Sequence, residues 1–279
     1  MATAAHDRIS PTALVALYFR AMAGLPYARE LAEASGAEAA FKRIVGDKVD
    51  RVRWMAPLLK AREMATDVLL ARWDCPNIVE FATGLSQRPF TWTEDPRLHY
   101  FATDLPNALD DNKRIIESLG LARPNLVWQA LNVVSEGDFA ALDLILPPGW
   151  IAWVCDGLIP YLTLEEQERM GSLIRARQKK RGGVWITADL TSRQRLRAFQ
   201  KIDPDLRDIM QSIAGLTGRD FEANVPETID EMEARYSKIG FSNIIRHEVG
   251  ELVTLSSLET DEPEKLEAML KNMNIWEIS

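Results

Sequence analysis

The chain has 279 residues, 47% of them hydrophobic and 27% charged, which excludes a largely disordered protein and allows a sizeable buried core. Its formal net charge of -8 argues against a basic nucleic-acid footprint over the whole chain. The apolar runs are shorter than the roughly 20 residues of a membrane helix. The two cysteines, Cys75 and Cys155, form no CxxC pattern. We therefore expect a cytoplasmic protein without a membrane segment, a nucleic-acid partner or a metal.

The first 74 residues predict helices. Ser10 can cap a helix that starts at Pro11, and apolar residues then recur at helical spacing. Two further helices are expected over Glu30–Ala40 and Val49–Ala71. We expect this N-terminal helical region, residues 1–74, to cover the active site of the domain that follows.

From Pro76 onward, short apolar strands alternate with helices. Strands are expected at Asn77–Ala82, Leu98–Thr103, Asn125–Ala130, Trp150–Cys155 and Val184–Ala188. This alternation predicts parallel βαβ units with right-handed crossovers, and hence a doubly wound, Rossmann-like α/β sheet over residues 75–190. Such a sheet binds its ligand at the carboxyl ends of the strands.

The alternation is interrupted between residues 191 and 226. This segment is helical and charged and begins just after a strand, so we expect a helical cap over the site. Residues 227–279 should complete the core with two helices and two strands. The expected elements are a helix over Glu227–Ile239, a strand over Asn243–Glu248, a helix over Pro263–Lys271 and a strand over Asn274–Ile278.

A glycine turn and an aspartate suggest an adenosine ligand. The turn EFATGLS, Glu80–Ser86, follows the first strand, and Gly84 has no Cβ to hinder a close ligand. A single glycine is not the GxGxxG fingerprint of dinucleotide sites. Asp104 follows 20 positions later at a strand end, where a carboxylate can accept hydrogen bonds from a ribose. It could also act as a helix N-cap ahead of Pro106.

Five segments in order resemble the leucine carboxyl methyltransferase family, which includes methyltransferases of bacterial polyketide and other secondary-metabolite pathways. They are ISPTALVALYFRA (9–21), KAREMATD (60–67), EFATGLSQRPF (80–90), TDLP (103–106) and WVCDGLIPYLTLEEQ (153–167). The resemblance covers most of residues 9–190 and fades in the expected cap. It implies a class I methyltransferase that uses S-adenosyl-L-methionine and releases S-adenosyl-L-homocysteine.

The resemblance also implies which residues hold the methionine end of this cofactor. Arg62 would pair with the methionine carboxylate, and Arg20 would lie near the same group or the substrate. Asp156 would lie near the amino group, although the family usually has glutamate there. The turn residues would face the methionine portion; they are Glu80, Ala82, Thr83 and Gly84.

The adenosine end would be held by residues after the second and third strands. Asp104, with the adjacent Leu105, would hold the ribose. Asn132 and Val133 would lie beside the adenine, with Asn132 standing where the family often has aspartate. An amide oxygen can still accept a hydrogen bond from the adenine amino group.

The expected reaction is methyl transfer to a carboxylate or hydroxyl oxygen of a small molecule, such as a secondary metabolite. A sulfonium methyl is already electrophilic, so the enzyme must mainly align the reactants and exclude water. Tyr161 is the candidate base, and Tyr18, Tyr27 and Arg193 are candidate substrate contacts.

Three other functions remain open from the sequence. They are carboxyl methylation of a protein C-terminus, nicotinamide-dependent oxidoreduction, and nucleoside binding without catalysis. The oligomeric state is not indicated by any pattern in the chain.

Overall fold

A computed structural model describes residues 11–46, 49–203 and 222–279. Its N-terminal helices are α1 (Pro11–Met22), α2 (Ala28–Ser35), α3 (Ala37–Val45), α4 (Val49–Val52) and α5 (Met55–Trp73). Both of the longer helices expected here are interrupted. Gly36 separates α2 from α3 with a left-handed φ of 67°, and its N–H caps the carbonyls that end α2. Ser10, the expected cap of α1, lies outside the described residues.

The seven-stranded sheet has the order β3-β2-β1-β4-β5-β7-β6. Neighbours among β1 to β5 pair in parallel, whereas β7 runs antiparallel to both β5 and β6. The doubly wound, Rossmann-like sheet is thus confirmed, with one reversed strand. The strands are β1 (Asn77–Phe81), β2 (His99–Asp104), β3 (Leu126–Ala130), β4 (Ile151–Cys155), β5 (Gly183–Thr187), β6 (Ile244–Glu248) and β7 (Asn274–Ile278).

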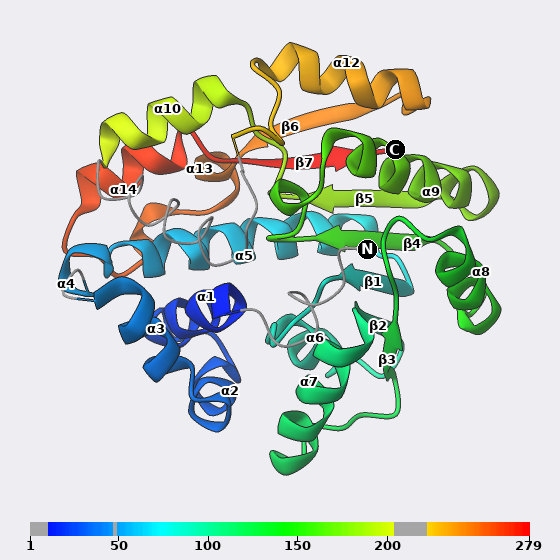
Figure 1. Ribbon diagram of the computed structural model, residues 1–279, viewed down its shortest axis with the longest axis horizontal. Coiled ribbons are helices and arrows are strands. Elements are labelled where there is room, and N and C mark those ends of the chain that lie inside the picture. The colour runs from blue at the N-terminus through cyan, green and yellow to red at the C-terminus, as the bar shows by residue number, and fades with distance from the viewer. Residues whose placement is uncertain (1–10, 47–48, 204–221) are drawn as a thin grey trace.

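Helices cover both faces of the sheet (Figure 1). One face packs against α5, α13 (Val249–Leu252) and α14 (Pro263–Leu270). The opposite face packs against α8 (Glu136–Ile145), α9 (Leu164–Arg181) and α12 (Ile229–Ile239). The other connections contain α6 (Arg88–Trp92), α7 (Pro106–Ser118), α10 (Arg193–Ile202) and the 3₁₀ turns η2 (Ile159–Tyr161) and η3 (Leu255–Ser257).

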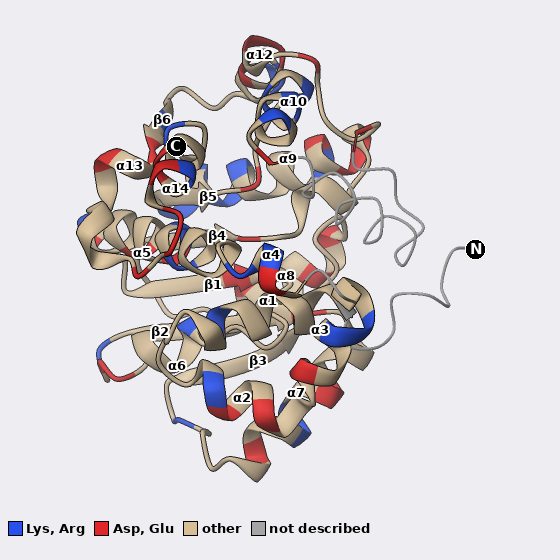
Figure 2. Ribbon diagram, turned by 90° about the vertical axis from the view of Figure 1, so that its left-hand side faces the viewer, with Lys and Arg blue, Asp and Glu red and all other residues tan. Residues whose placement is uncertain are grey.

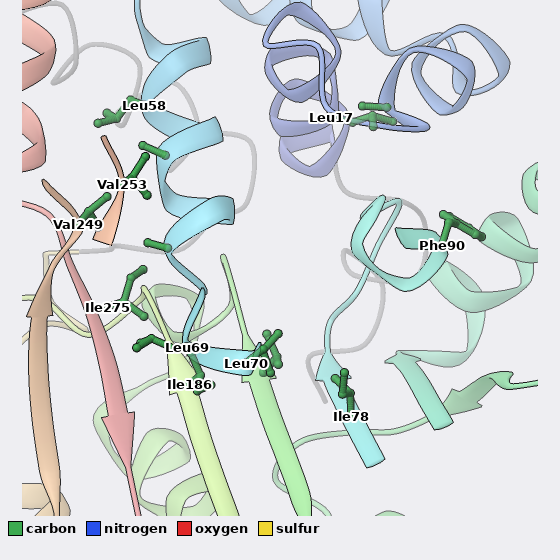
Figure 3. Close-up of a cluster of buried hydrophobic side chains, with 14 of the residues drawn as sticks. Leu17, Leu58, Leu69, Leu70, Ile78, Phe90, Ile186, Val249, Val253 and Ile275 are labelled. Atoms are coloured by element: carbon green, nitrogen blue, oxygen red, sulfur yellow. The ribbon is translucent and has the colours of Figure 1, made fainter. Parts of the chain in front are cut away.

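The strand sequences explain this two-sided burial. Successive side chains alternate between the faces, so Ala152 and Val154 of β4 face α5 while Trp153 and Cys155 face α9. Figure 3 shows the α5 face, where Leu69 and Ile186 lie in one fully buried cluster. Burial of each such side chain contributes about 1.5–3 kcal/mol.

The first helix reaches the carboxyl edge of the sheet. α1 packs on α2, α3 and α5, and a Cβ placed on Gly84 would lie 3.6 Å from the Cβ of Ala13. The N-terminal half of α1 therefore covers the turn that follows β1.

Only part of the expected cap lies among the described residues. α10 begins after the Ser192 side chain, which accepts a hydrogen bond from the N–H of Arg195, and it packs against α14. Residues 204–221 lie outside the described part of the chain. The division into residues 1–74, 75–190, 191–226 and 227–279 remains a prediction.

Charged residues of both signs lie on the outer helices, including α2 and α7 (Figure 2). Within the described ranges, no helix combines the length and the apolar character needed to cross a membrane.

Candidate active site

The turn after β1 is fixed to the end of β2 by Thr83. Its N–H donates to the carbonyl of Thr103 at 2.9 Å, and its Oγ1 accepts from the N–H of Thr103 at 3.1 Å. The flanking residues Ala82 and Gly84 have left-handed φ angles of 48° and 54°. The turn is therefore a tightly defined loop at the carboxyl edge of the sheet.

Asp104 holds the same turn with both of its carboxylate oxygens. Oδ2 accepts from the N–H of Gly84 at 2.9 Å, and Oδ1 accepts from the N–H of Leu105 at 2.8 Å. Burial raises the pKa of Asp104, although these two N–H groups act in the opposite direction. Each oxygen has a second lone pair, so the carboxylate can hold the turn and still accept hydrogen bonds from a ribose.

The predicted adenine residues lie beside Asp104. The N–H of Leu131 donates to the Asp104 carbonyl at 2.9 Å, which joins the segment after β3 to the end of β2. Asn132 is exposed, and its Oδ1 accepts from the N–H of Val134 at 3.2 Å. Val133 is buried against the α8 face of the core. Asp104, Leu105, Asn132 and Val133 thus lie together at one edge.

The predicted methionine-end residues meet in a buried cluster of charges. Arg62 of α5 forms an ion pair with Asp156, just after β4, with Nη2 and Oδ1 2.9 Å apart. Arg20 of α1 lies 3.7 Å from Oδ2 of the same carboxylate. The resemblance therefore grouped three residues that the structure also brings together.

Asp156 is ion-paired without being satisfied as a hydrogen-bond acceptor. Its side chain is 2% exposed, yet neither oxygen accepts a well-directed hydrogen bond from the described residues. The buried Nε of Arg62 similarly lacks an acceptor among them. Buried charged groups require such partners, so an ammonium beside Asp156 and a carboxylate beside Arg62 would complete this arrangement.

The sequence analysis missed Glu63 and Arg88, which form the centre of this cluster. Arg88 of α6 is fully buried and donates hydrogen bonds to three carboxylates. It forms ion pairs with Glu63, with Asp67 at 3.0 Å and with Glu80 at 2.8 Å. Arg88 lies in the EFATGLSQRPF segment, and an arginine directly after an apolar strand and turn was the only available signal.

Glu80 belongs to this buried cluster rather than to the open side of the turn. Its Oε2 accepts from the Tyr100 hydroxyl at 2.9 Å, and its Oε1 accepts from Arg88. Burial raises the pKa of Glu80 to about 7, against the lowering effect of Arg88. Glu80 thus contributes its charge to the cluster beneath the turn, and its expected contact with the cofactor stays a prediction.

Asp189, also missed, holds the loop that follows Asp156. Its oxygens accept from the N–H groups of Gly157 at 2.7 Å, Leu158 at 2.7 Å and Ile159 at 3.0 Å. Burial, and then the negative charge of Asp156, raises the pKa of Asp189.

The candidate substrate tyrosines, Tyr18 and Tyr27, both have partners within the protein. Tyr18 packs on Phe41 of α3, with ring centroids 4.7 Å apart. Tyr27 donates to Oε1 of Glu94 at 2.5 Å and accepts from Arg123 at 2.9 Å. Glu94 and Arg123 precede β2 and β3, so Tyr27 lies at the opposite end of these strands from the site. Periodicity alone could not place these side chains, because it does not give the direction in which α1 and α2 pack against the other helices.

The other two candidates are held by protein groups. Tyr161 donates to Oγ1 of Thr12 in α1 at 3.2 Å, and burial raises its pKa, which disfavours the phenolate that a base requires. Arg193, at the start of α10, donates to the carbonyl of Glu222 at 2.9 Å. Within the described ranges, no three His, Cys, Asp or Glu side chains gather as a metal site would require.

No protein-family model and no curated protein matches this sequence. Solved structures do match its fold. An O-methyltransferase family protein from Burkholderia thailandensis is 13% identical, with a TM-score of 0.51, over 85% of this chain and 61% of that one. A SAM-dependent methyltransferase from Anabaena variabilis is 12% identical, with a TM-score of 0.50, over 77% of this chain and 83% of that one.

A third match has a lower TM-score of 0.46. It is described as a putative O-methyltransferase from Nostoc punctiforme, is 13% identical and covers 78% of this chain. The chain spans 56% of the Nostoc protein and 61% of the Burkholderia protein, less than two thirds of each. The Burkholderia and Anabaena matches, together with the strand order, show that this chain has the Rossmann-like fold found in class I methyltransferases.

Proposed function

We propose that this protein is an S-adenosyl-L-methionine-dependent methyltransferase that transfers a methyl group to an oxygen of a small molecule. One observation carries the proposal: the carboxylate of Asp104, which could accept from a ribose, shares a sheet edge with an ion pair, Arg62 and Asp156, that is complementary to an amino-acid zwitterion. The fold and the ordered resemblance to leucine carboxyl methyltransferases support it.

Each end of the cofactor would have its own residues. Arg62 would bind the methionine carboxylate and Asp156 the ammonium group, both as charge-assisted contacts. Asp104 would accept from the ribose hydroxyls, and Asn132 and Val133 would lie along the adenine. The bound cofactor supplies an electrophilic methyl group on a sulfonium. The protein's share is to orient this methyl toward the acceptor and to exclude water, to which α1 contributes by covering the turn at Gly84.

The acceptor is proposed to be a carboxylate or a hydroxyl of a small molecule such as a secondary metabolite. A carboxylate is ionised at neutral pH and needs no base. This suits a site in which the candidate base Tyr161 has a raised pKa. Cytoplasmic location and the leucine carboxyl methyltransferase family are part of the same proposal.

The first test is calorimetric titration with S-adenosyl-L-homocysteine. We expect micromolar binding by the wild type and a loss of about tenfold or more for Asp104→Ala, because a buried charge-assisted acceptor is removed. Asp110→Ala is the matched control, since Asp110 is an exposed aspartate of α7 close by in sequence, and should bind within about twofold of the wild type.

A folded wild type that does not bind this ligand would refute the proposal. Binding of NADH in its place would favour an oxidoreductase. Cofactor binding without transfer of labelled methyl to any member of a carboxylate and phenol panel would favour a nucleoside-binding protein.

A further inference from the structure

We propose that Glu63 is a positioning residue that keeps Arg20 and Arg88 away from Asp156, so that the Asp156 carboxylate stays available to the ammonium group of the cofactor. The inference rests on the proposed function. Glu63 would not itself contact the cofactor. The inference also assigns different roles to Arg20 and Arg62, both of which the resemblance placed near the methionine carboxylate of the cofactor.

Glu63 divides its two oxygens between two arginines. Oε1 lies 2.7 Å from Nε and 2.6 Å from Nη2 of Arg20, a two-point contact. Oε2 forms an ion pair with Nη2 of Arg88 and also accepts from Nε2 of Gln87 at 3.4 Å. Glu63 is 1% exposed, so water does not compete for these contacts.

The same two Nη2 atoms also face Asp156. Nη2 of Arg20 is 3.7 Å and Nη2 of Arg88 is 3.8 Å from Oδ2 of Asp156, beyond hydrogen-bond distance. Each of these Nη2 groups therefore lies between Glu63 and Asp156 and is closer to Glu63, while the Nε and Nη1 of Arg88 are held by Asp67 and Glu80. Without the negative charge of Glu63, Asp156 is the neighbouring carboxylate toward which both Nη2 groups would move.

Glu63 is charged under ordinary conditions. Burial alone would raise its pKa, but Arg20 and Arg88 outweigh burial and lower it to about 2. Its hold on the two arginines is therefore constant across physiological pH, whereas the free acceptor capacity of Asp156 is left to the ligand.

Arg62 differs from Arg20 in this respect. It contacts Asp156 through one nitrogen, its Nε has no acceptor among the described residues, and its side chain is 22% exposed. The ligand carboxylate is thus assigned to Arg62, while Arg20 is engaged by Glu63.

The test compares two ligands that differ at the amino-acid end. S-Adenosyl-L-homocysteine carries the ammonium and carboxylate, whereas 5′-methylthioadenosine keeps the adenosine and thioether but has neither charge. For Glu63→Gln, we expect the affinity for S-adenosyl-L-homocysteine to fall about tenfold or more. The affinity for 5′-methylthioadenosine should stay within about twofold of the wild-type value. Glu136→Gln, which removes a charge paired with Arg177 between α8 and α9, should change neither affinity.

A double-mutant cycle separates positioning from general support of the fold. In an Asp156→Asn background, Glu63→Gln should cause little further loss, because the effect acts through Asp156. Equal losses for both ligands, no loss for either, or additive losses in the cycle would each overturn the inference. If the wild type binds neither ligand, the proposed function itself is refuted. If the wild type binds both ligands and Glu63→Gln leaves the ratio of the two affinities unchanged, only the inference about Glu63 is refuted.

A second measurement needs no folded variant at Glu63. In ¹⁵N spectra of arginine side chains, adding S-adenosyl-L-homocysteine to the wild type should shift the Nε–H signal of Arg62, and the signal of Arg20 should stay in place. A shift of the Arg20 signal as large as that of Arg62 would show that Arg20 contacts the ligand and would overturn the inference.

Discussion

The two halves of the candidate site are built in different ways. At the adenosine half, Asp104 is fixed by backbone N–H groups of its own neighbour Leu105 and of the adjacent turn. At the methionine half, Asp156 lies among guanidinium groups from α1, α5 and α6. Backbone donors come with the sheet, whereas buried charges must each be neutralised by a partner from elsewhere in the chain. The first half should therefore tolerate substitutions that the second does not.

The largest effect should follow from removing the central cation of the methionine half. Arg88→Met leaves Glu63 and Glu80 buried beside each other without their shared partner, and we expect a loss of about 3–5 kcal/mol in the free energy of unfolding. Urea denaturation measures it.

Arg177→Met is the control for this loss. Arg177 is also buried, but the side chains of its partners Glu136 and Asp143 are 57% and 30% exposed. Their charges remain hydrated, so the loss should stay below about 2 kcal/mol. Equal losses at Arg88 and Arg177 would remove the distinction between the buried cluster and a surface ion pair.

A pH-dependent effect should sharpen the comparison further. The pKa of Glu80 is about 7 in the folded protein against an ordinary value of 4.5, because burial disfavours its charge. Between these values the unfolded chain releases the proton while the folded protein retains it, so the free energy of unfolding falls as pH rises.

Glu80→Gln does not titrate and supplies the reference. The stability of the wild type relative to this variant should fall by roughly 3 kcal/mol between pH 4.5 and 8, as measured by urea denaturation at each pH. A constant or rising difference would mean that Arg88 and Tyr100 keep Glu80 ionised throughout this range.

The smallest effect concerns the turn after β1, which the Asp104 carboxylate holds in place. Ala82 has a left-handed φ of 48°, which costs a non-glycine residue about 1–2 kcal/mol. Ala82→Gly removes this cost but increases the conformational entropy of the unfolded chain. We therefore expect the free energy of unfolding, measured by heat or urea, to rise by about 0.5–1 kcal/mol. Ala102→Gly, in the buried strand β2, should instead destabilise the protein. Destabilisation at both positions would show that the methyl group of Ala82 packs against the site.

The sequence predicted the sheet well because most strands contain a short apolar run bounded by turn residues, although β6 (IIRHE) is largely polar. The seven expected strands all occur, with bounds that differ by at most one residue, as at Asn77–Phe81 and His99–Asp104. Helices were predicted less well where a segment is too short to show a helical repeat of apolar residues. The five-residue helix α6 is shorter than two helical turns, and the break at Gly36 depends on a single backbone angle. The reversed direction of β7 has no signature in its own residues.

The parts of the site formed by residues close together in the sequence could be predicted, whereas those formed by distant residues could not. Asp104 and Gly84 were recognisable from their 20-residue spacing and from where the strands end. Glu63 and Arg20 are 43 positions apart, and their contact depends on how α1 crosses α5, which no short pattern encodes. The contact of Tyr27 with Glu94, 67 positions away, likewise depends on packing between distant segments.

The position of β7 has a consequence for folding during synthesis. β7 lies between β5 and β6 but is the last of the three to be made, so the free edge of β5 has no neighbour when β6 leaves the ribosome. β6 cannot join the sheet until β7 emerges, about 26 residues later, which at roughly 5–20 residues per second is a delay of seconds. During this interval the edge of β5 is a place where a nascent chain would need protection from pairing with other strands.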